Sequence, residues 1–189
     1  MKVKINGYGQ RPEEAEAMQE QVQQRDTVDD IVDQWARARP EIDSGPMALI
    51  GRLRRLNLHV DSALREYFTQ HGLDTSEFDV LATLRRAGEP YELNARALLK
   101  SAMVTSGAIT NRVDRLSAKG LVERHPCPGD RRAVLVRLTP EGKELVDTLL
   151  LGHVRNEERL LAPLDQGERT QLDALLKKLL VAHGDVERL

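Results

Sequence analysis

Apolar residues recur every three or four positions along most of this 189-residue chain, which is the spacing of amphipathic helices. Three such stretches come first along the chain, and they run from Thr27 to Pro40, from Pro46 to Gly72 and from Ser76 to Ala87. Thr27, with Asp30 three positions later, is the predicted N-cap of the first helix. Residues 1–26 are polar, rich in Glu and Gln, and lack an apolar stripe, so they are predicted to form a flexible extension.

The middle of the chain carries two short helical patterns separated by a tight turn. Their predicted bounds are Ala95–Lys100, capped by Asn94, and Thr105 or Ser106 to Lys119, followed by Gly120. In the second helix Ile109, Val113 and Leu116 fall on one face. Two helices joined in this way predict a helix-turn-helix.

The C-terminal third begins with two predicted strands, Leu121–Arg124 and Ala133–Leu138. The Pro and Gly residues between them predict the loop of a β-hairpin. Two further helices follow, one starting at Thr139-Pro140-Glu141 and reaching about Leu160, and one capped by Asp165 and reaching about Ala182.

This order predicts a mainly α protein: a winged helix-turn-helix lobe with a two-stranded β-hairpin wing, framed by long N- and C-terminal helices. The helix from Pro46 to Gly72 is long enough to suggest an oligomer interface. The predicted parts are a flexible extension over residues 1–26, N-terminal helices over 27–72, the winged helix-turn-helix lobe over 73–139 and C-terminal helices over 140–189.

The exposed face of the second short helix and the hairpin tip carry residue types that bind DNA. Asn and Arg side chains pair with the edges of adenine and guanine in the major groove, and the negative potential of a narrow minor groove attracts arginine. Asp114, on the same exposed half of the helix, counts against a DNA-facing surface. The predicted DNA-contacting residues are Thr105, Ser106, Ala108, Thr110, Asn111, Arg115, Arg131 and Arg132.

Charge is distributed unevenly along the chain, although its net charge is only −2. The segment from Arg85 to Arg137 holds eleven Lys and Arg against five Asp and Glu. A basic segment in an otherwise acidic chain favours a localised anion-binding face.

Other classes of protein find little support in the sequence. The single cysteine, Cys127, excludes an internal disulfide and a cysteine zinc cage. The five histidines are scattered, and neither a GxSxG motif nor a phosphate-binding loop is present, so no enzyme activity, cofactor or metal is expected. No apolar run approaches membrane-spanning length, and the N-terminus lacks a secretory pattern, so no membrane partner and a cytoplasmic location are expected.

The stretch from Ser106 to Arg124, followed by Asp130-Arg-Arg and by Leu138-Thr-Pro-Glu-Gly142, resembles the MarR family of bacterial transcription regulators. The resemblance extends over residues 46–182. It implies a homodimer with interlocking N- and C-terminal dimerisation helices, residues 27–72 and 140–189, and a ligand crevice at the N-terminal helices. It also implies that the DNA-binding lobes, residues 73–139, bind a pseudo-palindromic operator in double-stranded DNA and usually repress nearby genes. The arginine of the family's Asp-x-Arg wing motif falls on Arg132.

One branch of that family responds to urate, and this chain is similar to it at four positions: Trp35, Asp79, Arg112 and Arg124. The resemblance implies a small-molecule effector, urate or a related purine, that weakens DNA binding. An indole face and forked guanidinium donors suit a planar, anionic heterocycle.

Several alternatives stay open at this point. Trp35 also fits a dimer core, Asp79 and Arg112 also fit a structural salt bridge, and the same crevice suits phenolic or aromatic acids. Oxidation of Cys127 would instead make the protein a redox regulator. A winged helix that binds another protein, consistent with the acidic N-terminal tail, would show little duplex affinity at any salt concentration.

Overall fold

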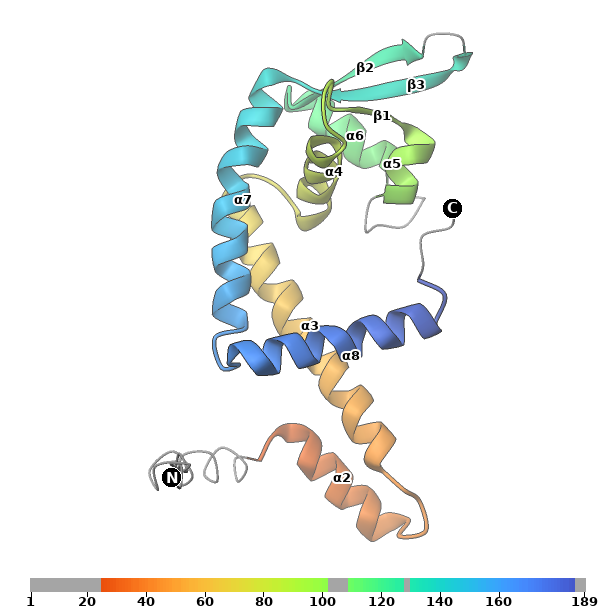
Figure 1. Ribbon diagram of the computed structural model, residues 1–189, viewed down its shortest axis with the longest axis vertical. Coiled ribbons are helices and arrows are strands. Elements are labelled where there is room, and N and C mark those ends of the chain that lie inside the picture. The colour runs from red at the N-terminus through yellow and green to blue at the C-terminus, as the bar shows by residue number, and fades with distance from the viewer. Residues whose placement is uncertain (1–24, 102–108, 128–129, 186–189) are drawn as a thin grey trace, which may run out of the picture. The chain divides into compact units, whose positions relative to one another are not determined.

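The computed structural model describes residues 25–101, 109–127 and 130–185 (Figure 1). The chain divides into two compact units, one ending at Leu58 and one beginning at His59. The elements, in order, are α2 (Thr27–Ala38), α3 (Gly45–Thr69), α4 (Thr75–Arg86), β1 (Glu92–Asn94), α5 (Ala95–Ser101), α6 (Ile109–Ala118), β2 (Val122–Cys127), β3 (Asp130–Leu138), α7 (Pro140–Leu160) and α8 (Gln166–Ala182). The predicted class, mainly α with a small antiparallel sheet, is confirmed.

The first unit contains α2 and the first half of α3. The N-cap of α2 is Asp26, so the prediction of Thr27 was wrong by one residue. Asp26 Oδ1 accepts hydrogen bonds from the backbone N–H groups of Val28 and Asp29, at 2.8 and 3.0 Å. Two acidic residues satisfy the free N–H groups and add negative charge where the helix dipole favours it. Arg52 of α3 joins both carboxylates, at 2.7 Å from Asp26 and 2.5 Å from Asp29.

The second unit has its hydrophobic core where α4 meets α5, α6, α7 and the sheet. The large side chains that are almost fully buried there are Phe68, Leu81, Leu84, Leu98, Leu116 and Leu149. Ile109, Val113 and Leu116 of α6 are all buried, so the predicted apolar face of that helix is confirmed. This packing leaves the opposite face of α6 exposed to solvent.

The sheet has three antiparallel strands in the order β1-β3-β2, one strand more than predicted. Strand β1 was missed because its three residues include a single apolar side chain, Leu93, which pairs with Val136 of β3. The Arg137 guanidinium reinforces this pairing by donating to Glu92 at 2.6 and 2.8 Å.

The wing strands are also longer than predicted. Residues predicted as loop continue β2 to Cys127, and β3 begins at Asp130. Pro126 pairs with Val134, and the register shifts directly after it. An edge strand tolerates Pro because its missing N–H faces away from the ladder or falls at an irregularity. Strands β2 and β3 therefore continue past β1 as a two-stranded ribbon, visible in Figure 1.

The C-terminal helices begin where predicted. The Thr139 hydroxyl accepts a hydrogen bond from the Gly142 N–H at 3.0 Å, with Pro140 in the first turn of α7. Asp165 and Glu168 form a reciprocal capping box at the start of α8. No helix in the described part of the chain is long and apolar enough to cross a membrane.

Candidate DNA-binding face and effector crevice

The helix-turn-helix consists of α5 and α6. Asn94, the last residue of β1, caps α5 through a hydrogen bond that its Oδ1 accepts from the Ala97 N–H at 2.8 Å, as predicted. Thr110 and Asn111 are exposed in the first turn of α6. The predicted DNA contacts at residues 105, 106 and 108 lie outside the described residues.

The wing contributes the other predicted contacts. Residues 131 and 132 belong to the first part of β3, next to the Cys127–Asp130 pair at the end of the ribbon. Strand β1 pairs only with residues 135–137 of β3, so the backbone at positions 131 and 132 lies beyond the three-stranded part of the sheet. The side chains of these two arginines lie outside the described part.

Arg115 has partners that the sequence analysis did not predict. Its Nε donates to Glu77 Oε1 at 3.0 Å, and a terminal nitrogen lies 2.7 Å from Asp74 Oδ2. Lys119 Nζ lies 2.7 Å from Glu77 Oε2 and also donates to the Gly72 carbonyl at 2.8 Å. We call Asp74, Glu77, Arg115 and Lys119 the α4–α6 clamp. Any contact of Arg115 with DNA would have to break these ion pairs.

Glu77 is the centre of the clamp, with only 3% of its side chain exposed. Burial alone raises the pKa of Glu77, but hydrogen bonds from Lys119, the Asp74 N–H and Arg115 outweigh burial and hold it below its usual 4.5. Asp74 and Glu77 also form the capping box of α4. The Asp74-x-x-Glu77 spacing is visible in the sequence and was the overlooked signal for this site.

A cavity of about 790 Å³ lies beside α4, lined by residues of α3, α4 and α7. We call it the crevice. Phe68 and Phe78 form part of its wall, with ring centroids 4.2 Å apart and planes at 23°. His153 packs on Phe78 at 5.1 Å, and its Nδ1 is buried without a hydrogen-bond partner in the described structure. The two rings are almost fully buried, so the crevice has an apolar, aromatic wall close to a nitrogen with unused hydrogen-bonding capacity.

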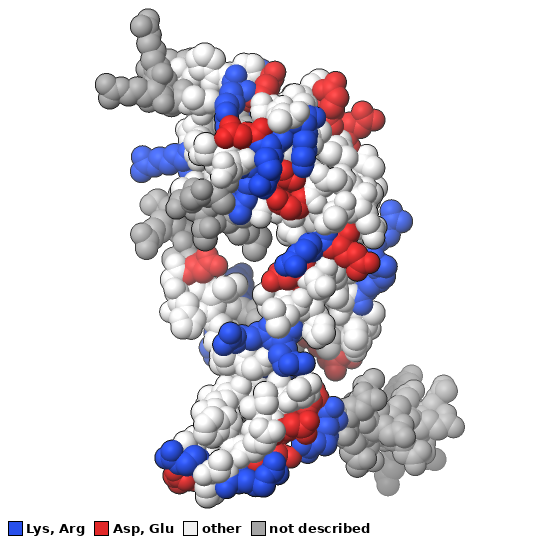
Figure 2. Space-filling view, turned by 180° about the vertical axis from the view of Figure 1, so that it is seen from behind, with Lys and Arg blue, Asp and Glu red and all other residues white. Residues whose placement is uncertain are grey.

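Charged residues of both signs line the rest of the crevice, including Asp79, Arg85, Arg86 and Asp147. Arg85 Nε lies 2.6 Å from Asp147 Oδ1. This hydrogen bond, followed by one from Lys143, lowers the pKa of Asp147 below its usual value. Figure 2 shows acidic and basic side chains lying next to one another on one face of the molecule, a pattern that matches such ion pairs.

The structure brings one of the four predicted effector residues, Asp79, into the lining of the crevice. Arg124 instead pairs with Asp114 at 2.6 Å. Arg112 is half-buried, and one of its terminal nitrogens is buried without a hydrogen-bond partner in the described structure. Trp35 belongs to the first unit and is 40% exposed.

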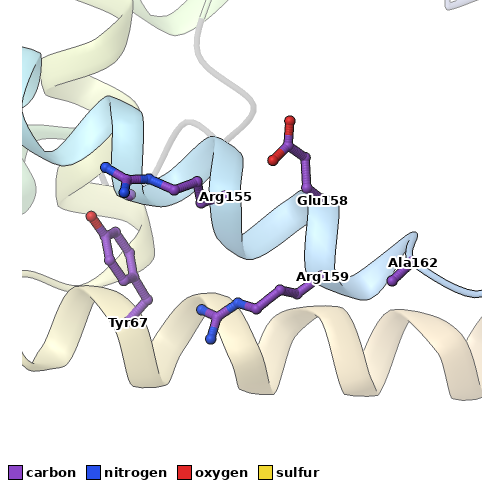
Figure 3. Close-up of a pocket in the computed structure, with 6 residues that line it drawn as sticks. Tyr67, Arg155, Glu158, Arg159 and Ala162 are labelled. Atoms are coloured by element: carbon purple, nitrogen blue, oxygen red, sulfur yellow. The ribbon is translucent and has the colours of Figure 1, made fainter.

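A second hollow, of about 610 Å³, lies between α3 and the C-terminal half of α7 and was not predicted. In Figure 3 the Arg155 and Arg159 side chains extend toward the Tyr67 side, and Glu158 points away. Tyr67 Oη donates to the Leu149 carbonyl at 2.9 Å. Among the described residues, no group of His, Cys, Asp and Glu is arranged to hold a metal ion.

Known proteins share both the sequence and the fold of this chain. The model of the MarR family matches residues 71–133. The transcriptional regulator PecS of Dickeya dadantii is 42% identical over 152 residues, which are 80% of this chain and 92% of PecS. The chain belongs to the MarR family. This confirms the resemblance inferred from the sequence and identifies a MarR-family transcriptional regulator.

Two solved structures of similar proteins extend the comparison. A cysteine-to-serine mutant of Escherichia coli MarR, solved with operator DNA, is 32% identical, with a TM-score of 0.63 over 77% of this chain and 97% of that chain. BpsR of Bordetella bronchiseptica, whose DNA binding is regulated by 6-hydroxynicotinic acid, is 26% identical, with a TM-score of 0.63 over 68% of this chain and 90% of that chain. Both relatives bind DNA.

Proposed function

We propose that this MarR-family protein is a homodimeric repressor that binds a pseudo-palindromic operator, and that a small anionic heterocycle weakens the binding. The observation that carries the DNA-binding part is the exposed first turn of α6, with Thr110 and Asn111, beside a two-stranded ribbon. The relative solved with operator DNA supports it. Fold alone would not be sufficient, because winged helices also bind proteins.

In this proposal α6 enters the major groove of the operator. The Asn111 amide pairs with an adenine edge, since an amide carries one donor and one acceptor at the required spacing. The ribbon carries Arg131 and Arg132 toward the neighbouring minor groove, whose negative potential attracts guanidinium groups. Contacts with phosphates fix the register of the lobe on the duplex.

The homodimer is supported by apolar surface that one chain leaves exposed. The large apolar side chains exposed on α7, on α8 and in the turn between them are Leu150, Leu151, Val154, Leu161, Leu175, Leu176, Leu179, Leu180 and Val181. Within α8, Leu175, Leu176, Leu179 and Leu180 recur at helical spacing and form an exposed apolar stripe, which is typical of an interface. A two-fold dimer presents two recognition helices and therefore selects an operator with two related half-sites.

The effector in this proposal is urate or a related purine bound in the crevice. Asp79 accepts hydrogen bonds from ring N–H groups, the apolar wall formed by Phe68 and Phe78 packs against the heterocycle, and a guanidinium neutralises its charge. The similarity to the urate-responsive branch of the family at Trp35, Asp79, Arg112 and Arg124 supports this class. An aromatic acid is the second candidate, favoured by the regulation of BpsR by 6-hydroxynicotinic acid.

A fluorescence-anisotropy titration tests DNA binding, using labelled duplexes from the region upstream of the protein's own gene. We expect a preferred duplex whose affinity falls steeply with rising salt, because bound phosphates release counterions. Arg132→Ala should weaken binding, whereas Arg65→Ala, which removes an exposed arginine from α3, should not. Absence of any duplex preference at low ionic strength would refute the proposal.

Adding urate or 6-hydroxynicotinic acid to the operator complex tests the effector. Urate should release the wild-type protein, and Asp79→Asn and Trp35→Ala should raise the urate concentration that is needed. If Trp35→Ala does not change the urate concentration that releases the operator, Trp35 is not part of the effector site. Release by 6-hydroxynicotinic acid alone selects the second candidate.

A further inference from the structure

The N-terminal end of α4, Thr75–Asp79 with its N-cap Asp74, contributes residues both to the crevice and to the α4–α6 clamp. Thr75, Ser76 and Asp79 line the crevice. Asp74 and Glu77, from the same turn and its cap, hold α6 through the α4–α6 clamp. A displacement of this turn by an occupant of the crevice therefore acts directly on the residues that hold the recognition helix.

We propose that the α4–α6 clamp couples the crevice to the recognition helix, with Glu77 as the positioning residue. This inference rests on the proposed function, since it requires an operator and an effector. In it, an occupant shifts the first turn of α4, Glu77 moves with that turn, and Arg115 and Lys119 carry the C-terminal end of α6 along. The recognition helix then leaves the orientation that fits the major groove.

The clamp is suited to transmit a displacement rather than absorb it. The Glu77 carboxylate accepts charge-assisted hydrogen bonds from Arg115 at 3.0 Å and Lys119 at 2.7 Å, and a further one from the Asp74 N–H at 2.9 Å. Because this carboxylate is almost fully buried, separating it from its cations would leave an uncompensated charge. Moving α6 together with α4 avoids that cost.

Apart from the ion pair of Asp114 with Arg124 of β2, at 2.6 Å, the other described attachments of α6 are less directional. Ile109, Val113 and Leu116 hold the helix by apolar packing, which resists removal from the core but defines rotation and tilt weakly. Hydrogen bonds have narrow distance and angle ranges, so the clamp sets the orientation of α6. Lys119 adds a second anchor on the Gly72 carbonyl, in the turn that leads into α4.

The effector must bind the two positions of the α4 turn with different affinity, because a ligand that binds both equally shifts nothing. Thr75 and Ser76 carry hydroxyl groups, and Asp79 carries a carboxylate. A heterocycle with several N–H and carbonyl groups can bridge such side chains, and their spacing changes as the turn moves. This is the chemistry of the purine class proposed above.

The test removes the charges of the clamp and keeps the hydrophobic stems, in Arg115→Met and Lys119→Met. The readout is the ratio of operator Kd with saturating urate to operator Kd without urate, together with calorimetric urate binding to the DNA-free protein. For wild type we expect a ratio of about 5–150, the usual range for coupled sites. Both variants should bring this ratio below about 2, with urate affinity unchanged within about twofold.

Arg52→Met is the matched control. Arg52 joins the capping-box carboxylates Asp26 and Asp29 of α2 in the same way as Arg115 joins those of α4, but in the first unit of the chain. For Arg52→Met, the ratio of operator Kd with urate to operator Kd without urate should equal that of wild type. Folded Arg115→Met and Lys119→Met proteins that keep the wild-type ratio would overturn the coupling role of the clamp.

A tethered occupant makes the test independent of urate. Ser76→Trp places a large ring in the crevice and should weaken operator binding in the wild-type background, but much less in the Lys119→Met background. Additive effects in this double-mutant cycle overturn the inference even if urate binds. If the wild-type protein binds no operator, the proposed function is refuted, and the inference that rests on it is refuted as well.

Discussion

Gly142 is the residue where one added methyl group should most disturb the lobe. It lies in the first turn of α7, where the helix passes over the residue that precedes β2. A Cβ atom at Gly142 would overlap the carbonyl oxygen of Leu121 and lie 2.9 Å from its carbonyl carbon and 3.2 Å from its Cα. The obstacle is backbone, which cannot rotate away as a side chain can.

The expected loss in the free energy of unfolding for Gly142→Ala is the sum of three contributions. Overpacking of this kind costs about 1–3 kcal/mol, and a backbone obstacle places it at the upper end. The oxygen that the methyl group meets also accepts the Thr139 N–H at 3.2 Å, and losing that bond costs about 1 kcal/mol more. Alanine recovers about 1 kcal/mol through its higher helix propensity. We expect Gly142→Ala to destabilise the protein by about 3 kcal/mol, which for this size is about 6–12 °C in Tm.

Thermal unfolding followed by circular dichroism measures this effect, at one fixed protein concentration because association raises Tm. Gly167→Ala is the matched control. It also lies in the first turn of a helix, α8, but the nearest atom to its added Cβ is the side-chain oxygen of Asp165 at 3.2 Å, so we expect a Tm equal to wild type or higher. A Gly142→Ala protein as stable as wild type would refute the close-approach argument.

Two further predictions concern buried polar groups. Asn156→Ala should lower the free energy of unfolding by about 1–3 kcal/mol, because the Ala63 carbonyl loses the amide donor that lies 3.2 Å away. Urea denaturation at constant protein concentration measures this loss. Glu77 has a pKa below its usual 4.5 in the folded state, so its contribution is complete above about pH 4.5 and is lost as pH falls through the lowered pKa. Urea titrations between about pH 6 and 3 should show a flatter acid limb for Glu77→Gln, and an unchanged slope would contradict this assignment.

Local signals explain why most helix bounds were predictable. Thr139 with Pro140, Asp165 with Glu168, and Asn94 each act within one turn of the helix they cap, so the sequence contains the whole interaction. Strand β1 differs, because Glu92–Asn94 becomes a strand only through its pairing with β3, more than forty residues away. A run of three residues carries no periodicity of its own.

For the candidate site, the sequence predicted which residues of α6 lie on its exposed face, but not which partners their side chains reach. The helical period places Asn111 outward and Val113 inward, and the structure agrees. The same period places Arg115 outward, but its long side chain reaches back to α4 and pairs with Glu77. The direction of a Cα–Cβ bond does not define the end point of a flexible side chain, and the partners come from an element 38 residues away.

The central position of β3 has a consequence for the DNA that the lobe accepts. On one side β3 pairs with β1, whose last residue caps α5, and on the other with β2, which follows α6 across Gly120. The Thr139 hydroxyl, directly after β3, closes the loop by donating to the Gly120 carbonyl at 2.8 Å. These contacts fix the distance between α6 and the ribbon within one chain. In the proposed operator complex, we therefore expect natural operators to vary in length between the half-sites rather than within them.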